Sequence, residues 1–234
     1  MPRKIAGIRA VTSALNQKQL EIAAVYLARN HPDIEKLANQ RRIPVEHRPD
    51  HELDCLVPEI RHQGAVAIAG PYPYADISQL LEEAPSRVVV LDGITDPYNF
   101  GAIVRSSVAF GVKHIVIQQR RACPVTPVVV RASTGATEYA CIARVSNISR
   151  TLAHLSKSGY ETLGLAAEGN GDLSLLETTN RPKALVIGSE GTGLRRLVAA
   201  HCEQLVRIPL EGPMESLNAS VAAGVALYVA TRSM

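Results

Sequence analysis

The sequence predicts an α/β fold with a mainly parallel sheet, preceded by a smaller α/β domain. Short runs rich in Val, Ile and Leu recur along the chain, and segments with helical spacing separate them. Such alternation is typical of a parallel sheet covered by helices on both faces. Residues 71–86 contain prolines, which resist both helix and central strand, so they are predicted to link domains at 1–70 and 87–234.

The front domain, residues 1–70, is expected to consist of short alternating elements. The apolar spacing predicts a helix from Gly7 to Leu15, a strand over 23–28, a helix over 32–41, a strand over 45–48, a helix over 51–56 and a strand over 65–69. This domain holds ten basic and eight acidic residues before Gly70, so it offers no single basic groove.

The second domain opens with the β-branched run 87–92, which is typical of a buried parallel strand. Further strands are predicted at 114–117, 161–166, 184–188 and 204–208, with helices running through Phe110, over 151–158 and over 217–230. The last helix carries no charged residue, which predicts that it is buried.

Composition excludes several classes of protein. The chain has no run of about eighteen uncharged apolar residues and no apolar stretch at its start, so we expect a cytoplasmic protein without a membrane segment. Its four cysteines show no C-x-x-C pair and are expected to be buried free thiols. The seven histidines show no ligand spacing, and we predict no metal.

Positive charge is concentrated in one segment although the net charge is only +3. From Arg105 to Arg150 there are seven basic residues against one acid, Glu138. This segment could face a polyanion such as RNA, and the alternative is an ordinary solvated surface.

Three loops share the layout of strand, polar loop and apolar helix, and ligands of parallel sheets bind at such loops. They are 92–105, 188–194 and 208–218. Ser216 and Asn218 could be simple helix caps. The glycine-rich second loop does not fit a Walker loop, because Leu194-Arg195 follows its last glycine, and it does not fit G-x-G-x-x-G, because Arg196 holds the place of the third glycine.

Taken together, the three loops resemble the three motifs of the SpoU/TrmH family of RNA ribose 2′-O-methyltransferases. The motifs are Asp92-Gly93-Ile94-Thr95-Asp96-Pro97 with Asn99, Gly101 and Arg105; Val186 to Gly191 with Gly193; and Ile208-Pro209-Leu210 with Ser216 to Ala222. The front domain is similar to the family's L30e-like substrate-binding domain, including His62-Gln63-Gly64. The whole chain most resembles the bacterial enzymes that methylate a guanosine of 23S rRNA.

The resemblance implies a SPOUT fold with a C-terminal trefoil knot, S-adenosylmethionine as methyl donor, and a homodimer. It assigns donor binding to backbone groups of Gly188, Ile208 and Leu217. The catalytic role falls on Arg105, with Asn99, Glu190, Ser216 and Asn218 holding it and the substrate. Arginine stays protonated in proteins, so we expect Arg105 to stabilise the developing alkoxide rather than act as a base.

Other functions remain open from the sequence. The substrate could be tRNA rather than rRNA. The same two-domain fold could also belong to a non-catalytic RNA-binding protein, but such a protein would be expected to have lost Arg105, Asn99 or Glu190. An enzyme acting on a small nucleotide-like substrate would not need the front domain.

Overall fold

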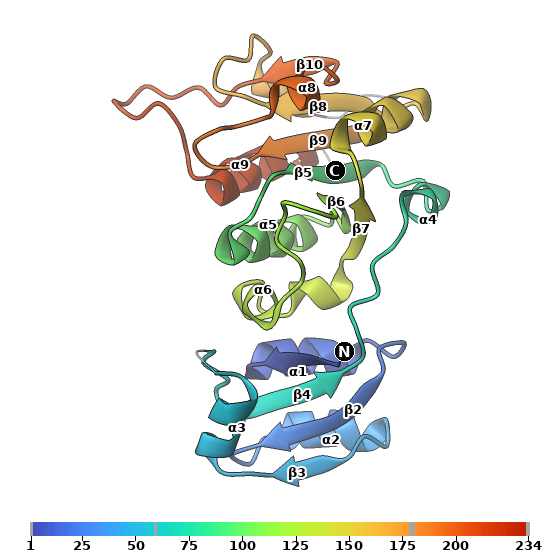
Figure 1. Ribbon diagram of the computed structural model, residues 1–234, viewed down its shortest axis with the longest axis vertical. Helices are drawn as coiled ribbons and strands as arrows, with labels where there is room; N and C mark the ends of the chain where they lie inside the picture. The colour runs from blue at the N-terminus through green and yellow to red at the C-terminus, as the bar shows by residue number, and fades with distance from the viewer. Residues whose placement is uncertain (1, 59, 178–180, 233–234) are drawn as a thin grey trace. The chain divides into compact units, whose positions relative to one another are not determined.

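The computed structural model describes residues 2–58, 60–177 and 181–232 (Figure 1). The chain forms two compact units. Unit 1 contains the residues up to Pro73 together with Pro124–Tyr139, and unit 2 contains Tyr74–Cys123 and the residues from Ala140 onward. Within the described residues no helix is long and apolar enough to span a bilayer.

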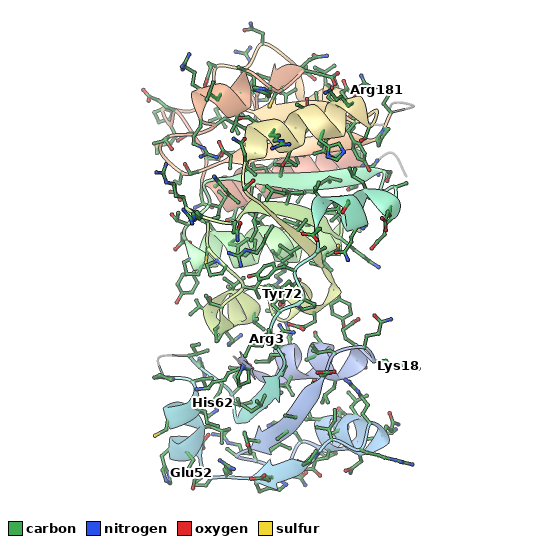
Figure 2. All side chains as sticks on the ribbon, turned by 45° about the vertical axis from the view of Figure 1, so that its right-hand side comes forward. Arg3, Lys18, Glu52, His62, Tyr72 and Arg181 are labelled. Atoms are coloured by element: carbon green, nitrogen blue, oxygen red, sulfur yellow. The ribbon has the colours of Figure 1, made fainter. Side chains whose placement is uncertain are left out.

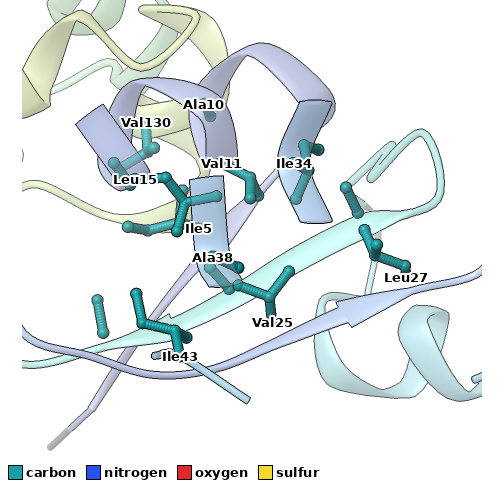
Figure 3. Packing of buried hydrophobic residues seen from close by; sticks show 14 residues of the cluster. Ile5, Ala10, Val11, Leu15, Val25, Leu27, Ile34, Ala38, Ile43 and Val130 are labelled. Carbon is teal, nitrogen blue, oxygen red and sulfur yellow. The ribbon is translucent and has the colours of Figure 1, made fainter. Parts of the chain in front are cut away.

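Unit 1 is built on a four-stranded sheet in the order β1-β4-β2-β3. Its strands are β1 (Arg3–Ala6), β2 (Ile22–Leu27), β3 (Val45–His47) and β4 (Ala65–Ala69), and only the β2–β3 pair is parallel. Helices α1 (Ile8–Asn16) and α2 (Pro32–Gln40) cover one face, where Ile5, Val11 and Ala38 share a core (Figure 3). Helix α3 (Asp50–Leu56) packs through Leu53 on the opposite face, against Ala6 and Val66.

The segment 124–139 joins unit 1, although the sequence analysis assigned it to the domain at 87–234. It forms α6 (Pro127–Ala132) and the 3₁₀ helix η1 (Ala136–Tyr139), and Val130 completes the core of unit 1 (Figure 3). The buried guanidinium of Arg3 forms a bidentate ion pair with Glu138, with both N–O distances 2.7 Å. Two stretches far apart in sequence therefore fold as one body.

Unit 2 contains a six-stranded, wholly parallel sheet, which confirms the predicted α/β fold with a mainly parallel sheet. Its order is β10-β8-β9-β5-β6-β7, with β5 (Arg87–Asp92), β6 (His114–Gln118), β7 (Cys141–Val145), β8 (Glu161–Leu165), β9 (Lys183–Gly188) and β10 (Gln204–Val206). One face is covered by α4 (Ile77–Glu82), α7 (Ile148–Lys157) and α8 (Arg196–Ala199). Helices α5 (Pro97–Ala109) and α9 (Ala219–Thr231) pack together, and α9 also contacts β9 and the 3₁₀ helix η2 (Leu173–Leu176) (Figure 1).

The structure contains elements that the sequence analysis missed, and it corrects one prediction. Strands β1 and β7 and helix α6 were not expected, because each is short; β1 and α6 also lie beside glycine or proline, and β7 mixes apolar residues with a charge. Helix α9 is not buried all round: Val221 is 51% exposed and Tyr228 is 55% exposed. Its small residues pack against α5 and β9, while these two large residues lie on the outward face.

Candidate active site

The three polar loops of unit 2 follow β5, β9 and β10, at the carboxyl ends of the parallel strands. Strands β5, β6 and β7 extend the sheet in one direction, and β8 to β10 lie on the other side of β5. The strand order therefore reverses between β5 and β9, and ligands of such sheets bind at this switch point. The loops after β5 and β9 adjoin it directly, because Asp92 and Gly188 are register partners.

A cluster of three side chains joins the loops. Asn99 donates from Nδ2 to Glu190 at 3.0 Å, and Asn218 donates from Nδ2 to the same Glu190 oxygen at 2.9 Å and to Asn99 Oδ1 at 2.9 Å. Asn218 also caps α9, because its Oδ1 accepts from the backbone N–H of Ser220 at 2.9 Å. That bond fixes which end of the amide faces Glu190. Capping and the polar cluster are thus two uses of one side chain.

Asn99 is positioned by the start of α5. Asp96 caps this helix, and its carboxylate accepts from the backbone N–H of Asn99 at 2.6 Å. Pro97 occupies the first turn, where a missing N–H costs nothing. The local sequence therefore holds Asn99 in the first turn of α5, facing the loop after β9.

A pocket of about 550 Å³ opens beside this cluster, between the loops after β8, β9 and β10. The three residues predicted to bind the donor, Gly188, Ile208 and Leu217, all line it. Glu190 and Ser216 also line it, so the polar cluster borders the pocket through Glu190. The volume lies within the range of small-molecule and cofactor sites.

Gly188 is required by the backbone around the pocket. Ser189 and Gly193 exchange two backbone hydrogen bonds, of 3.1 and 2.9 Å, which fold the loop back over the end of β9. A Cβ at Gly188 would collide with the carbonyl of Gly193 and the backbone nitrogen of Leu194. Gly191 and Gly193 have φ values of 84° and 61°, which favour glycine. The pocket wall is therefore made largely of closely packed backbone.

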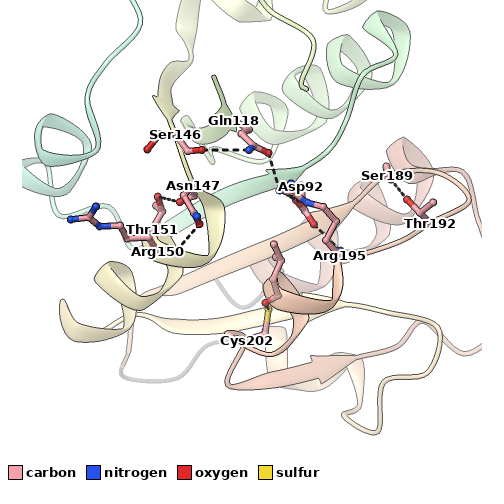
Figure 4. A network of polar contacts seen from close by, with 11 residues as sticks. Asp92, Gln118, Ser146, Asn147, Arg150, Thr151, Ser189, Thr192, Arg195 and Cys202 are labelled. Atoms are coloured by element: carbon pink, nitrogen blue, oxygen red, sulfur yellow. Dashed lines mark hydrogen bonds and ion pairs between the residues drawn. The ribbon is translucent and has the colours of Figure 1, made fainter. Parts of the chain in front are cut away.

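A buried carboxylate anchors the far end of the same loop (Figure 4). Asp92, only 1% exposed, accepts hydrogen bonds from the backbone N–H of Arg195 at 2.9 Å and from its Nε at 2.7 Å. Arg195 also donates to Oε1 of Gln118 at 2.8 Å. The last residue of β5 thus holds the residue that follows the glycine-rich loop.

Arg105 lies apart from the other predicted site residues. It is exposed on α5 and does not line the pocket. Its side chain makes no hydrogen bond or ion pair with any residue that the structure describes. The geometry of one chain therefore gathers Asn99, Glu190, Ser216 and Asn218, and it leaves the guanidinium free for another group.

Two parts of the site were missed by the sequence analysis. The loop 166–168 after β8 lines the pocket, although the sequence analysis predicted only a strand over 161–166 here. The sequence could have indicated this loop, because it follows a predicted parallel strand and therefore lies at the carboxyl ends of the strands, where ligands bind. The Asp92–Arg195 contact had no such signal, since 103 positions separate the two residues.

Burial disfavours ionisation of the three thiols of unit 2. Burial, with a smaller effect of Asp92, raises the pKa of Cys202 to about 12. Burial also raises the pKa of Cys123 and of Cys141. Cys55 is exposed and Cys141 and Cys202 are half-buried, which corrects the prediction that all four thiols are buried.

One group of possible metal ligands occurs among the described residues, at the amino ends of the strands. Glu83, His114 and Cys141 place their ligand atoms within 4.8 Å of one another, with the latter two at the amino ends of β6 and β7. None of them lines the pocket. The expectation that the protein uses no metal stays a prediction.

Comparison with protein families gives two matches along the chain. Residues 86–228 match the model of the SpoU rRNA Methylase family. Residues 4–75 match the model described as RNA 2'-O ribose methyltransferase substrate binding. The two matches together span both units of the fold.

Individual relatives support the same grouping. The chain is 36% identical to the 23S rRNA (guanosine-2'-O-)-methyltransferase RlmB of Pseudomonas putida, over 98% of this chain and 96% of the relative. It is 45% identical to an uncharacterised tRNA/rRNA methyltransferase of Mycolicibacterium smegmatis over 82% of this chain, and this match spans only 62% of that relative's length.

Solved structures show the same fold. The structure of the SpoU methyltransferase AviRb from Streptomyces viridochromogenes aligns with a TM-score of 0.85 and 25% identity, covering 99% of this chain and 89% of that one. AviRb has also been solved in complex with AdoMet.

Proposed function

The chain belongs to the SpoU rRNA methylase family, and from this premise we propose that it transfers a methyl group from S-adenosylmethionine to a ribose 2′-hydroxyl of RNA. We place the target at a guanosine of large-subunit rRNA, because the Pseudomonas putida relative named for that activity aligns over almost the whole chain. Such a substrate would place the protein in the cytoplasm. The observation that carries the proposal is the Asn99–Glu190–Asn218 cluster bordering a backbone-walled pocket at the switch point.

The pocket fits the methyl donor. A sulfonium donor, when bound, supplies an electrophilic methyl group. The close backbone approach at Gly188 and the exposed peptide groups of the loop suit a ligand held by main-chain hydrogen bonds. We assign donor binding to Gly188, the last residue of β9, and to Ile208 and Leu217 in the loop after β10.

We propose that the polar cluster and Arg105 act on the RNA. Methyl transfer is an in-line displacement in which the 2′-oxygen forms a bond to the methyl carbon as the carbon–sulfur bond breaks, and it depends on positioning. Glu190, fixed by two amides, and Ser216 border the pocket and would orient the ribose. The guanidinium of Arg105 would bind a phosphate and stabilise the developing alkoxide, while the hydroxyl proton leaves to a phosphate oxygen or water.

We propose a homodimer through α5 and α9. These helices pack together and present an apolar outward face, on which Tyr98 is 68% exposed, Val221 51% and Tyr228 55%. Arg105 is exposed on α5 beside this face, so it is free to act at the partner's pocket. We expect Val221→Glu to give a monomeric mass by light scattering and to lose activity. The control Leu197→Glu, at a residue 60% exposed on α8, should stay dimeric.

The trefoil knot and the L30e-like character of the front domain also remain proposals. Support for the knot comes from β10, which pairs with the segment after β8: Ala166 donates to Val206 at 3.0 Å and Gly171 to Leu205 at 2.9 Å. The chain then returns across the sheet to place α9 against η2 and β9. An experimental structure whose backbone unties when its ends are drawn apart would contradict the knot.

The test of the activity is methyl transfer from labelled S-adenosylmethionine to total RNA from cells lacking this protein, followed by mapping of the labelled ribose. Label at one guanosine of large-subunit rRNA is the expected result, and Asn99→Ala should reduce it. Label on tRNA would keep the reaction and overturn the substrate. Donor binding without label on any RNA would contradict the enzymatic function.

A further inference from the structure

Unit 1 contains a cavity of its own, of about 420 Å³, which is lined by charged side chains, unlike the backbone-walled pocket of unit 2. It lies where β1 and β2 end and β4 begins, since Ala6 pairs with Val66 and Leu27 with Ala65. Its walls come from the first turn of α1, the segment after β2, helix α3 and the residues before β4. All of these lie within unit 1.

The turn that forms one wall is held in a single conformation. His62 is 6% exposed, and its Nδ1 accepts from the backbone N–H of Gly64 at 3.0 Å (Figure 2). That bond assigns the ring hydrogen to Nε2, which donates to Asp54 at 3.0 Å. Gln63, between them, has a φ of 57°, which glycine tolerates far better than glutamine. A strained, anchored turn of this kind presents its side chains in fixed directions.

Groups around the cavity lack partners within the described part of the chain. His31 Nε2 is buried and makes no hydrogen bond there. Helix α1 begins at Ile8 after Gly7, and no side chain caps it, so its first N–H groups stay open. The side chain of Arg61 is exposed and makes no hydrogen bond or ion pair with a described residue. Buried polar groups in folded proteins are almost always satisfied, which points to a ligand.

The charges of the cavity favour an anion at one end. Arg29 and Arg61 line it together with Asp50 and Asp54. Asp50 lies 3.5 Å from Arg29 and Asp54 accepts from His62, so the guanidinium of Arg61 is the lining charge without a partner among the described residues. The backbone oxygen of Arg61 accepts from Arg131 Nε at 3.0 Å, which fixes the base of that side chain. Guanidinium groups and a helix N-terminus together suit a phosphate.

We propose that this cavity binds one unstacked nucleotide of single-stranded RNA, with its phosphate on Arg61 and the start of α1 and its base against His31 and Gln63. Single-stranded RNA is recognised through splayed bases, and the cavity volume lies in the range that holds a ligand of this size. The proposal rests on the proposed function and deepens it, because it names the surface that selects the RNA. The cavity holds the substrate strand and takes no part in the chemical step.

The test compares Arg61→Gln with Arg42→Gln, which makes the same change at an exposed arginine of unit 1 outside the cavity. The probe is a short fluorescein-labelled single-stranded oligoribonucleotide, titrated with the full chain and followed by anisotropy. We expect Arg61→Gln to raise Kd about tenfold and to reduce the slope of log K against log salt by about 0.7, the value for one phosphate contact. Arg42→Gln should match the wild type. Equal effects of the two changes would overturn the proposal, as would a wild-type protein that does not bind the probe.

A second variant tests the base end of the cavity. His31→Leu keeps a side chain of similar size and removes the buried nitrogen, so we expect KM for protein-free large-subunit rRNA to rise severalfold with kcat unchanged. Donor affinity, measured by calorimetry, should be unchanged in both cavity variants. An unchanged KM, or a fall in kcat alone, would overturn the base assignment. Failure of the wild type to methylate any RNA would instead contradict the proposed function, so the two failures are distinguishable.

Discussion

The pocket of unit 2 and the cavity of unit 1 both lie at the loop edge of a small sheet, but different chemistry forms them. The first is walled by backbone from glycine-containing loops after parallel strands, and Gly188 marks its tightest point. The second is lined by long charged side chains, among them Arg29 and Arg61, around a mixed sheet. The unit 2 pocket is therefore formed mainly by backbone, and the unit 1 cavity mainly by side chains.

This difference predicts opposite sensitivities to mutation. A backbone-built site tolerates many side-chain changes and fails when a Cβ enters the space of a peptide group. A side-chain site keeps its backbone when an arginine is replaced and loses charge-assisted contacts instead. Glycine substitutions should therefore damage the unit 2 pocket most, and polar substitutions the unit 1 cavity.

The largest effect is expected from Gly188→Ala, because the new methyl group collides with the backbone at Gly193 and Leu194. We expect donor binding to be lost in calorimetry and the free energy of unfolding to fall by about 1–3 kcal/mol. Gly212→Ala is the matched control, since nothing lies within 4 Å of its added Cβ. Donor affinity within twofold of wild type in Gly188→Ala would remove the basis of the comparison.

The next effect concerns Arg105, a predicted catalytic residue that does not line the pocket. Arg105→Lys keeps the charge and loses the planar fork, so we expect kcat for RNA methylation to fall about a hundredfold with donor affinity unchanged. Arg150→Lys, at an exposed position on α7, serves as the control. Near-normal turnover in Arg105→Lys would show that a bidentate guanidinium is not needed.

The same division explains what could be predicted from the sequence. Buried parallel strands such as Arg87–Asp92 produce long β-branched runs, and the loops after them carry local motifs, so the sheet of unit 2 and the lining by Gly188, Ile208 and Leu217 were predictable. Strand β7 was missed because Cys141–Val145 mixes apolar and charged residues at the edge of its sheet.

Other features depend on contacts between distant residues and could not be predicted. The docking of Val130 into unit 1 and the pairing of Arg3 with Glu138 join segments more than a hundred positions apart. The exposure of Val221 and Tyr228 follows from which neighbours α9 packs against, and a uniformly apolar helix gives no periodicity from which to infer it. The cavity of unit 1 had no motif beyond His62-Gln63-Gly64.

A smaller effect is expected at the anchor of the glycine-rich loop. Arg195→Gln removes the charged partner of buried Asp92 and leaves the backbone N–H in place, so we expect the free energy of unfolding to fall by about 1–2 kcal/mol. The loop 188–194 should loosen, and Kd for the donor should rise about tenfold by calorimetry. Arg196→Gln, at the adjacent exposed residue, is the control. Equal donor affinity in both variants would show that the pocket does not depend on this anchor.

The smallest expected effect concerns Cys202, behind the pocket wall, and tests whether water reaches it. Cys202 packs with Leu194 against the core of unit 2, and its pKa is raised to about 12, whereas an unfolded cysteine has a pKa of about 8.5. The neutral thiol is therefore favoured in the folded state, and its contribution to stability is complete below pH 8.5 and declines as pH rises toward 12. Between about pH 8.5 and 9.5 the free energy of unfolding should fall by about 1 kcal/mol more in the wild type than in Cys202→Ala, measured by urea denaturation.

Cys55→Ala, at an exposed thiol of unit 1, should follow the wild type. Equal slopes in all three proteins would mean that water reaches the wall, and the contrast between a closed backbone pocket and an open side-chain cavity would be lost.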